Sequence, residues 1–273
     1  MQKYQFKPLK LLAISAFLTI LAASCSTSPT GRSQMVLKSD AELAAEGTRQ
    51  FNKLRDEAPL VKDRATIDYV ACVANAIVEV LDDKNRSMYW ELAVIEQAQV
   101  NAFVMPGGKI SVFSGILGVA KNQHQLAAVM GHEVAHVTAK HSNERASRAM
   151  VTGVSVDIAA ILLGGGYSQQ TAAASSALGT GAALGILNPF SRLQESEADL
   201  VGLDYMAMAG FDPRESVELW QNMIAANKTN VPEFMSTHPS GETRIEDLVD
   251  ALPHALALYN TAQAEGKNPN CQR

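Results

Sequence analysis

The sequence predicts an α+β fold that is mostly helical, with a small β-sheet early in the chain. Two observations lead to this class. Apolar residues recur at helical spacing over much of the chain, whereas residues typical of strands gather in two neighbouring stretches, 88–96 and 101–117. Because these stretches cluster instead of alternating with helices, the α+β class is favoured.

Residues 1–24 have the layout of an export signal. Three lysines precede an apolar run over residues 11–23, which is shorter than the roughly 20 residues that a membrane-spanning helix needs. The stretch LAASC resembles a bacterial lipobox, in which cleavage precedes Cys25 and that cysteine is lipidated. An uncleaved anchor and a plain secreted protein cut near Ala23 are the alternatives. Ser26 favours the outer membrane by resemblance to lipoprotein sorting rules, so we expect a periplasmic protein on the inner leaflet of that membrane.

The segment after the expected cleavage site is polar and rich in Ser, Thr, Pro and Gly. We therefore expect a lipidated cysteine and tether over residues 25–39, a folded domain over 40–265 and a polar tail over 266–273. Removing residues 1–24 takes away three lysines and no acids, which changes the net charge from −5 to −8. This acidic balance argues against nucleic acid as a partner.

The elements of the domain follow from local patterns. A helix is expected over residues 40–57, with acids in its first turn, and another over 64–81, ended by the polar run DDKNRS. The stretch MYWELAVIE, residues 88–96, is rich in aromatic and β-branched residues and predicts a strand. In 101–117, two apolar runs flank Pro106-Gly107-Gly108, which predicts a β-hairpin or strand pair with a glycine-rich turn.

The rest of the chain is predicted to be helical, over residues 123–141, 191–209, 213–226 and from about 242 to 265. Residues 146–187 are apolar, small and glycine-rich, and we interpret them as a mobile helical hairpin packed on the domain. A lid or a membrane-facing insert is the alternative. Cys72 and Cys271 remain if Cys25 is lipidated; a disulfide and two unpaired thiols are equally compatible with the sequence, which does not give their separation.

One helix carries a metal-binding pattern. His132 and His136 are four residues apart, so both imidazoles project from one face and can reach one zinc ion. Glu133 follows the first histidine and is placed to act as a general base on a metal-bound water, which is the HExxH pattern. Histidines satisfied in a helical core are the alternative, but unpaired polar groups are costly in so apolar a helix. His141 lies off the ligand face.

Catalytic zinc needs a third protein ligand, and the stretch ESEAD offers one. Glu195 and Asp199 share a helix face, while Glu197 points elsewhere. We expect Glu195 to bind the metal and Asp199 to accept a hydrogen bond from a ligand histidine, most readily His132. A solvated acidic helix start is the alternative.

Four motifs in order, NAFVMPGGKISVFSG, GHEVAH, ESEAD and STHPSGETRI, resemble the HtpX-like and CAAX-prenyl-protease zinc metallopeptidases, and among them the periplasmic lipoprotein branch. The resemblance covers roughly residues 28–252. It implies a zincin-like metallopeptidase domain and a gluzincin site, with one zinc ion on His132, His136 and Glu195 and with Glu133 as base.

The same resemblance implies further roles. The segment that begins with Asn101, Ala102 and Phe103 would bind the substrate peptide by strand addition. His238 would act at the catalytic centre, either as an added zinc ligand that blocks the water position or as a group that stabilises the oxyanion; a loop histidine that caps a helix is the alternative. Arg244 would anchor this loop through a carboxylate, near the ESEAD helix.

The sequence therefore predicts a lipid-anchored zinc endopeptidase. Its expected substrates are polypeptides, namely unfolded, misfolded or stalled envelope and outer-membrane proteins, which the resemblance implies. A chaperone or assembly factor for outer-membrane proteins, with latent protease activity blocked by His238, is the first alternative. A structural zinc protein, with His238 as its fourth ligand, is the second.

Overall fold

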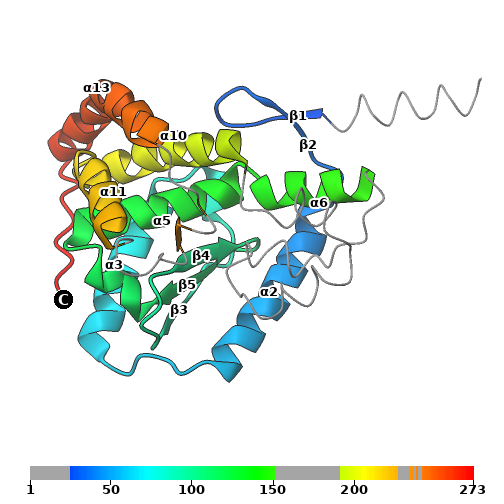
Figure 1. The fold of residues 1–273 in the computed structure, drawn as a ribbon, viewed down its shortest axis with the longest axis horizontal. Coiled ribbons are helices and arrows are strands. Elements are labelled where there is room, and N and C mark those ends of the chain that lie inside the picture. Colours follow the sequence, from blue (N-terminus) through cyan, green and yellow to red (C-terminus); the bar gives the residue numbers. More distant parts are fainter. Residues whose placement is uncertain (1–24, 152–190, 227–233, 236–237, 239–241) are drawn as a thin grey trace, which may run out of the picture.

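The computed structural model describes residues 25–151, 191–226, 234–235, 238 and 242–273. A small sheet lies against helix α5, and α10 packs on α5 from the other side, with the remaining helices around them (Figure 1). This is the expected mostly helical α+β arrangement. The helices are α2 (Asp40–Glu57), α3 (Arg64–Glu79), α4 (Asp83–Arg86), α5 (Gln123–Thr138), α6 (His141–Val151), α10 (Arg192–Met208), α11 (Glu215–Ala226) and α13 (Glu242–Ala264), with a 3₁₀ turn, η1 (Ser114–Gly118).

The predicted strands form one three-stranded sheet in the order β3-β5-β4. The middle strand, β5 (Lys109–Phe113), runs parallel to β3 (Glu91–Ile95) and antiparallel to β4 (Ala102–Met105). The hairpin prediction is confirmed, and its turn contains Gly107 and Gly108, whose φ values of 86° and 75° suit glycine. Strand β4 is an edge strand of this sheet.

Several predicted helices begin at polar caps. The side chain of Ser39 accepts a hydrogen bond from the Glu42 amide at the start of α2, whose predicted bounds are confirmed. Ser191 forms a capping box with Gln194 at the start of α10. These caps satisfy amides that a helix start leaves unpaired, which is why the sequence placed these boundaries well.

The expected single helix over 123–141 is two helices. Helix α5 ends at Thr138, and α6 begins at His141. Lys140 between them has a φ of 56°, in the left-handed region that commonly ends helices. Helical propensity alone does not reveal this break, because Ala139 and Lys140 are both good helix formers.

Helices α5 and α10 cross at two glycines. A Cβ atom on Gly131 would lie 2.5 Å from the carbonyl oxygen of Gly202, and one on Gly202 would lie 2.6 Å from the amide nitrogen of His132. The backbones therefore approach more closely than any larger side chain would permit. This contact brings the HExxH helix and the ESEAD helix together.

The segment expected to be a tether has a defined structure from Cys25 onward. Strands β1 (Cys25–Thr27) and β2 (Ser33–Met35) form an antiparallel hairpin beside the start of α10 (Figure 1). Ser28 and Gln34 in this hairpin are buried. The polar composition, read as a tether, here reflects side chains that bond to the domain instead of to water.

The C-terminal tail is joined to two earlier elements of the domain. Cys72 on α3 forms a disulfide with Cys271, whose Cα atoms are 5.7 Å apart, so the bridge that the sequence left open is present. The tail also pairs with the start of α5, because the Cys271 amide donates to Gln123 Oε1 at 2.7 Å.

Some predictions lie outside the described residues. These are the export signal over 1–24, most of the glycine-rich segment 146–187, and residues 236–237 and 239–241 of the STHPSGETRI motif. Within the described ranges, every helix is too short or too polar to cross a membrane.

Candidate metal centre

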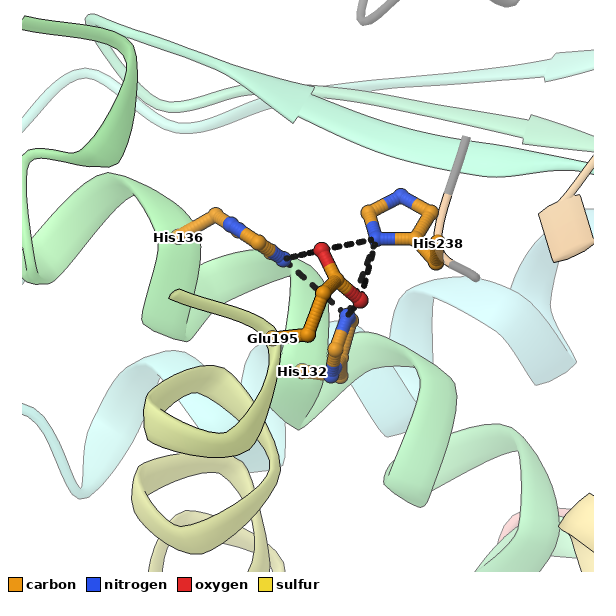
Figure 2. Close-up of side chains that lie close together, drawn as sticks. All are labelled: His132, His136, Glu195 and His238. Carbon is orange, nitrogen blue, oxygen red and sulfur yellow. Dashed lines mark hydrogen bonds and ion pairs between the residues drawn. The ribbon is translucent and has the colours of Figure 1, made fainter. Parts of the chain in front are cut away.

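Four buried side chains from three parts of the chain converge at one point. They are His132 and His136 from α5, Glu195 from the first turn of α10, and His238 (Figure 2). Nε2 of His132 lies 3.0 Å from Nε2 of His136 and 3.1 Å from Nδ1 of His238. The Glu195 carboxylate lies 3.1–3.6 Å from all three imidazoles. The predicted ligands are therefore brought together.

These distances suit one zinc ion. Ligand atoms 2.0–2.1 Å from a tetrahedral zinc lie about 3.3–3.4 Å from one another. The chemistry of the donors agrees with this geometry. Nδ1 of His132 faces Asp199, so a neutral His132 carries its proton on Nδ1 and a lone pair on Nε2. That lone pair points toward the ring nitrogens of His136 and His238 and toward the Glu195 carboxylate. A cation is the partner that satisfies such a cluster, and three nitrogens with one carboxylate oxygen are a donor set that zinc accepts.

His132 is held from behind by Asp199, as expected. Its Nδ1 lies 2.9 Å from Asp199 Oδ1. Arg244 from α13 donates to the same carboxylate through Nε and Nη2, at 2.6 and 2.7 Å, and pairs with Glu195 at 2.9 Å. Its Nη1 also donates to the His238 carbonyl at 3.3 Å. Arg244 thus joins the loop histidine to the ESEAD helix, where the sequence placed it.

Glu133 is the buried carboxylate beside the centre. Its Oε1 lies 3.3 Å from Nε2 of His238 and accepts no hydrogen bond from the part of the chain that the structure describes. Burial raises the pKa of Glu133, and His238 and His132 oppose that rise. A carboxylate with an unused oxygen and a raised pKa is suited to exchange a proton with a reacting group.

The ligand carboxylate behaves differently from Glu133. Burial alone would raise the pKa of Glu195, yet His238, His132 and His136 around it hold the pKa well below its ordinary value. Burial alone would likewise lower the pKa of His132, but hydrogen bonds to Asp199 and Glu195 raise it to about 9. The charged forms of Glu195 and His132 are therefore stabilised by the close partners of each group, against the effect of burial.

The predicted substrate-binding residues lie at the start of edge strand β4. The register pairs Ala102 with Val112 and Phe103 with Ser111, and the Asn101 carbonyl accepts from the Phe113 amide at 3.0 Å. Backbone groups of residues 101 and 103 therefore face β5, and those of Ala102 face the free edge. The Ala102 amide is already bonded to Asn101 Oδ1 at 2.9 Å. Of the three residues, only Ala102 faces the edge.

The sequence missed a buried network behind His136. Nδ1 of His141 lies 2.9 Å from Nδ1 of His136, and Nε2 of His141 lies 3.1 Å from Glu197. His141 is indeed off the ligand face, as expected, but it is fully buried against a ligand. Glu197 points away from the four-residue cluster, as expected, and contacts His141, Thr30 and Arg32. The sequence signal for this network was Glu197 itself, because a buried acid on a helix needs a hydrogen-bonding partner.

The fold and the four-residue cluster define a zincin-like metallopeptidase domain whose site fits one zinc ion. A family model described as Peptidase family M48 matches residues 65–252, which is more than half of the chain. The chain belongs to peptidase family M48.

Curated relatives agree with this assignment. The chain is 40% identical over 198 residues to the mitochondrial metalloendopeptidase OMA1 of Schizosaccharomyces pombe, covering 71% of this chain and 55% of the relative. It is 30% identical over 251 residues to the metalloendopeptidase OMA1 of Bos taurus, covering 85% and 46%. The β-barrel assembly-enhancing protease of Escherichia coli K12 is 28% identical over 207 residues, covering 74% and 42%. The chain spans about half the length of these relatives.

Proposed function

We propose that the protein is a zinc-dependent endopeptidase that hydrolyses peptide bonds of misfolded or stalled envelope proteins. One observation carries the proposal: Glu133, with a buried oxygen that accepts no hydrogen bond from the described residues, lies beside a cluster in which His132, His136 and Glu195 converge. A pure binding protein has no need of such a base. Family membership supports the same reading.

The residues divide the work of hydrolysis. When bound, zinc lowers the pKa of a water molecule and polarises the substrate carbonyl. Glu133 takes the proton from the attacking water and then gives it to the leaving amine. The edge of β4 beside α5 holds the peptide in an extended conformation by main-chain hydrogen bonds, and among residues 101–103 the Ala102 carbonyl is the contact, because the Ala102 amide is bonded to Asn101.

His238 keeps this protease latent. Its Nδ1 lies 3.1 Å from both His132 Nε2 and Glu195 Oε1, which is the spacing of a fourth ligand in a tetrahedron. Its Nε2 lies 3.3 Å from Glu133 Oε1, so it also covers the base. Activation then requires His238 to leave, after which it can stabilise the oxyanion from the side. A chaperone or assembly factor with this blocked protease is the second candidate function.

The proposed setting is the bacterial periplasm. This proposal rests on the export signal and on the lipobox-like stretch that ends at Cys25. We propose that the protein is anchored by lipid to the inner leaflet of the outer membrane and belongs to the lipoprotein branch of the family. Relatives named as β-barrel assembly-enhancing proteases support envelope proteins as substrates. Relatives named as mitochondrial metalloendopeptidases support the endopeptidase activity.

The test compares cleavage of casein and of an unfolded outer-membrane protein by the full chain, by Glu133→Gln and by His238→Ala, with zinc content measured for each. We expect Glu133→Gln to keep zinc and lose at least about a hundredfold in rate, which is the lower end of what a positioned base contributes. His238→Ala should cleave faster than wild type.

The control for His238→Ala is His254→Ala, because His254 is an exposed histidine on α13. It should match wild type in zinc content and in rate. If wild type and His238→Ala both bind one zinc ion and cleave neither substrate, the endopeptidase proposal is wrong and the binding role is favoured. If His238→Ala loses zinc, a structural zinc site is favoured instead.

A further inference from the structure

We propose that Arg32, in the N-terminal hairpin, is a positioning residue for the metal ligand His136, acting through Glu197 and His141. The inference rests on the proposed role of His136 as a zinc ligand. It assigns a function at the metal centre to a segment about a hundred residues before the HExxH motif, whose composition is that of a tether.

The first step is the orientation of His136. Its Nε2 points into the metal cluster, 3.0 Å from His132 Nε2, so a metal-binding His136 carries its proton on Nδ1. That Nδ1 lies 2.9 Å from Nδ1 of His141. His136 therefore donates to His141, and His141 must carry its own proton on Nε2.

The second step is the orientation of His141. Its Nε2 lies 3.1 Å from Glu197 Oε2, and the exposed fraction of His141 is 0%. The ring accepts on one side and donates on the other, so Glu197 selects the tautomer that can receive the His136 proton. Lys140, whose left-handed conformation separates α5 from α6, lies between the two histidines, so His141 is the first residue of a new helix.

The third step is the hold on Glu197. Arg32 donates to its Oε2 through Nε at 3.1 Å and Nη2 at 2.9 Å. Thr30 donates to Oε1 from its hydroxyl at 2.6 Å and from its amide at 3.3 Å. Both carboxylate oxygens are thus bound by the hairpin. These bonds fix the orientation in which Glu197 accepts the hydrogen bond from His141 Nε2.

Arg32 is itself fixed. Its Nη1 and Nη2 donate to the two oxygens of Glu144 on α6, at 2.9 and 2.8 Å, and Gln194 donates to Glu144 at 2.9 Å. One guanidinium therefore joins a carboxylate of α6 to a carboxylate of α10, in the paired geometry that suits arginine and not lysine. Its side chain is only 22% exposed.

The other metal-binding imidazole has an arrangement of the same kind. His132 Nδ1 bonds to Asp199, and Arg244 holds Asp199. His136 Nδ1 bonds to His141, which bonds to Glu197, which Arg32 holds. Each ligand histidine is thus oriented by a chain of hydrogen bonds ending at an arginine, one from each end of the domain. Such partners typically contribute 10–100-fold to metal affinity.

The test measures zinc affinity of the full chain by competition with a chromogenic chelator. Arg32→Gln should weaken zinc binding about tenfold, and Thr30→Val, which keeps the shape but removes one donor, about threefold. With Co²⁺ in place of zinc, Arg32→Gln should change the visible absorption spectrum, because that spectrum reports ligand geometry. Neither readout depends on proteolysis.

Arg148→Gln is the matched control. Arg148 also donates to Glu144, at 2.6 Å, but from a side chain that is 56% exposed. This variant should leave zinc affinity within about twofold of wild type and the Co²⁺ spectrum unchanged, because Arg148 lies outside the series of hydrogen bonds that ends at His136. Thermal melting of the metal-free variants separates stability from positioning.

The outcomes are distinct. If Arg32→Gln and Thr30→Val lower the melting temperature of the metal-free chain but leave zinc affinity and the Co²⁺ spectrum unchanged, the hairpin is merely structural and the inference is overturned. If Arg32→Gln does not fold, the zinc affinity of Thr30→Val tests the inference in its place. A His136→Gln variant that keeps wild-type zinc affinity overturns the proposed ligand set itself, whereas loss in His136→Gln without loss in Arg32→Gln overturns only this inference.

Discussion

Carboxylates near the metal centre differ in the direction of their pKa shifts because their neighbours differ. Burial raises the pKa of Glu133, whose Oε1 makes no hydrogen bond within the described chain. The same burial acts on Asp199, but Arg244 and His132 reverse its effect and lower the pKa. Two acids of similar burial are therefore suited to different tasks: Glu133 to proton exchange, and Asp199 to a permanent charge that orients His132.

This difference leads to a prediction for Asp199→Asn. The amide keeps the size of the side chain but removes the charge that His132 and Arg244 share, so His132 loses its preferred orientation. We expect zinc affinity to fall about tenfold, measured by chelator competition. Asp204→Asn, on the same helix and half-exposed, is the control and should bind zinc as wild type does. Equal affinity in the two variants would contradict the role given to Asp199.

At the scale of elements, the site depends on how closely α5 and α10 cross. The metal needs ligands from both helices within about 3.3–3.4 Å of one another. Gly131 and Gly202 allow this approach, since a Cβ atom on either would overlap the backbone of the other helix. The crossing, and not either helix alone, creates the three-ligand geometry.

Gly202→Ala should therefore damage both stability and the metal site. Its added methyl group would lie 2.6 Å from the His132 amide nitrogen, so α10 must shift away from α5. We expect a loss of about 1–3 kcal/mol in the free energy of unfolding, measured with denaturant, together with weaker zinc binding. Gly118→Ala is the control, because a Cβ atom there meets no atom within 4 Å. If Gly202→Ala binds zinc as tightly as Gly118→Ala, the crossing is not what sets ligand distance.

At the scale of the whole molecule, both ends of the described chain are bonded to other elements of the domain. The N-terminal hairpin reaches α6 and α10 through Arg32, and the C-terminal segment reaches α3 through the Cys72–Cys271 disulfide. The disulfide joins residues 199 positions apart, so it closes a loop that includes the whole metal centre. Closing so long a loop restricts the unfolded chain considerably.

The double variant Cys72→Ser, Cys271→Ser should accordingly be less stable by about 2–4 kcal/mol in denaturant unfolding. Wild type treated with reductant should show the same loss, and reductant should not affect the double variant. Zinc should still bind the folded double variant, since neither cysteine contacts the cluster. Unchanged stability under reductant would show that the bridge contributes nothing to folding.

Much of this fold could be predicted because its signals are local. Caps such as Ser39 and Ser191 mark helix starts, and the turn at Gly107-Gly108 marks the hairpin, so these features need no tertiary information. The break at Lys140 was missed because its left-handed conformation is imposed by packing and not by residue type. The N-terminal hairpin was missed because its polar residues look solvated until their buried partners are known.

The sequence by itself determined which residues share the helix faces that meet in the cluster. Helical spacing places His132 and His136 on one face and Glu195 with Asp199 on another, and spacing follows from backbone geometry alone. Only the tertiary structure decided that His238 meets Glu133 and the cluster, and that His141, Glu197 and Arg32 stand behind His136. Those contacts join residues between 5 and 165 positions apart, and they form because buried polar groups must find partners wherever the chain crossing brings them.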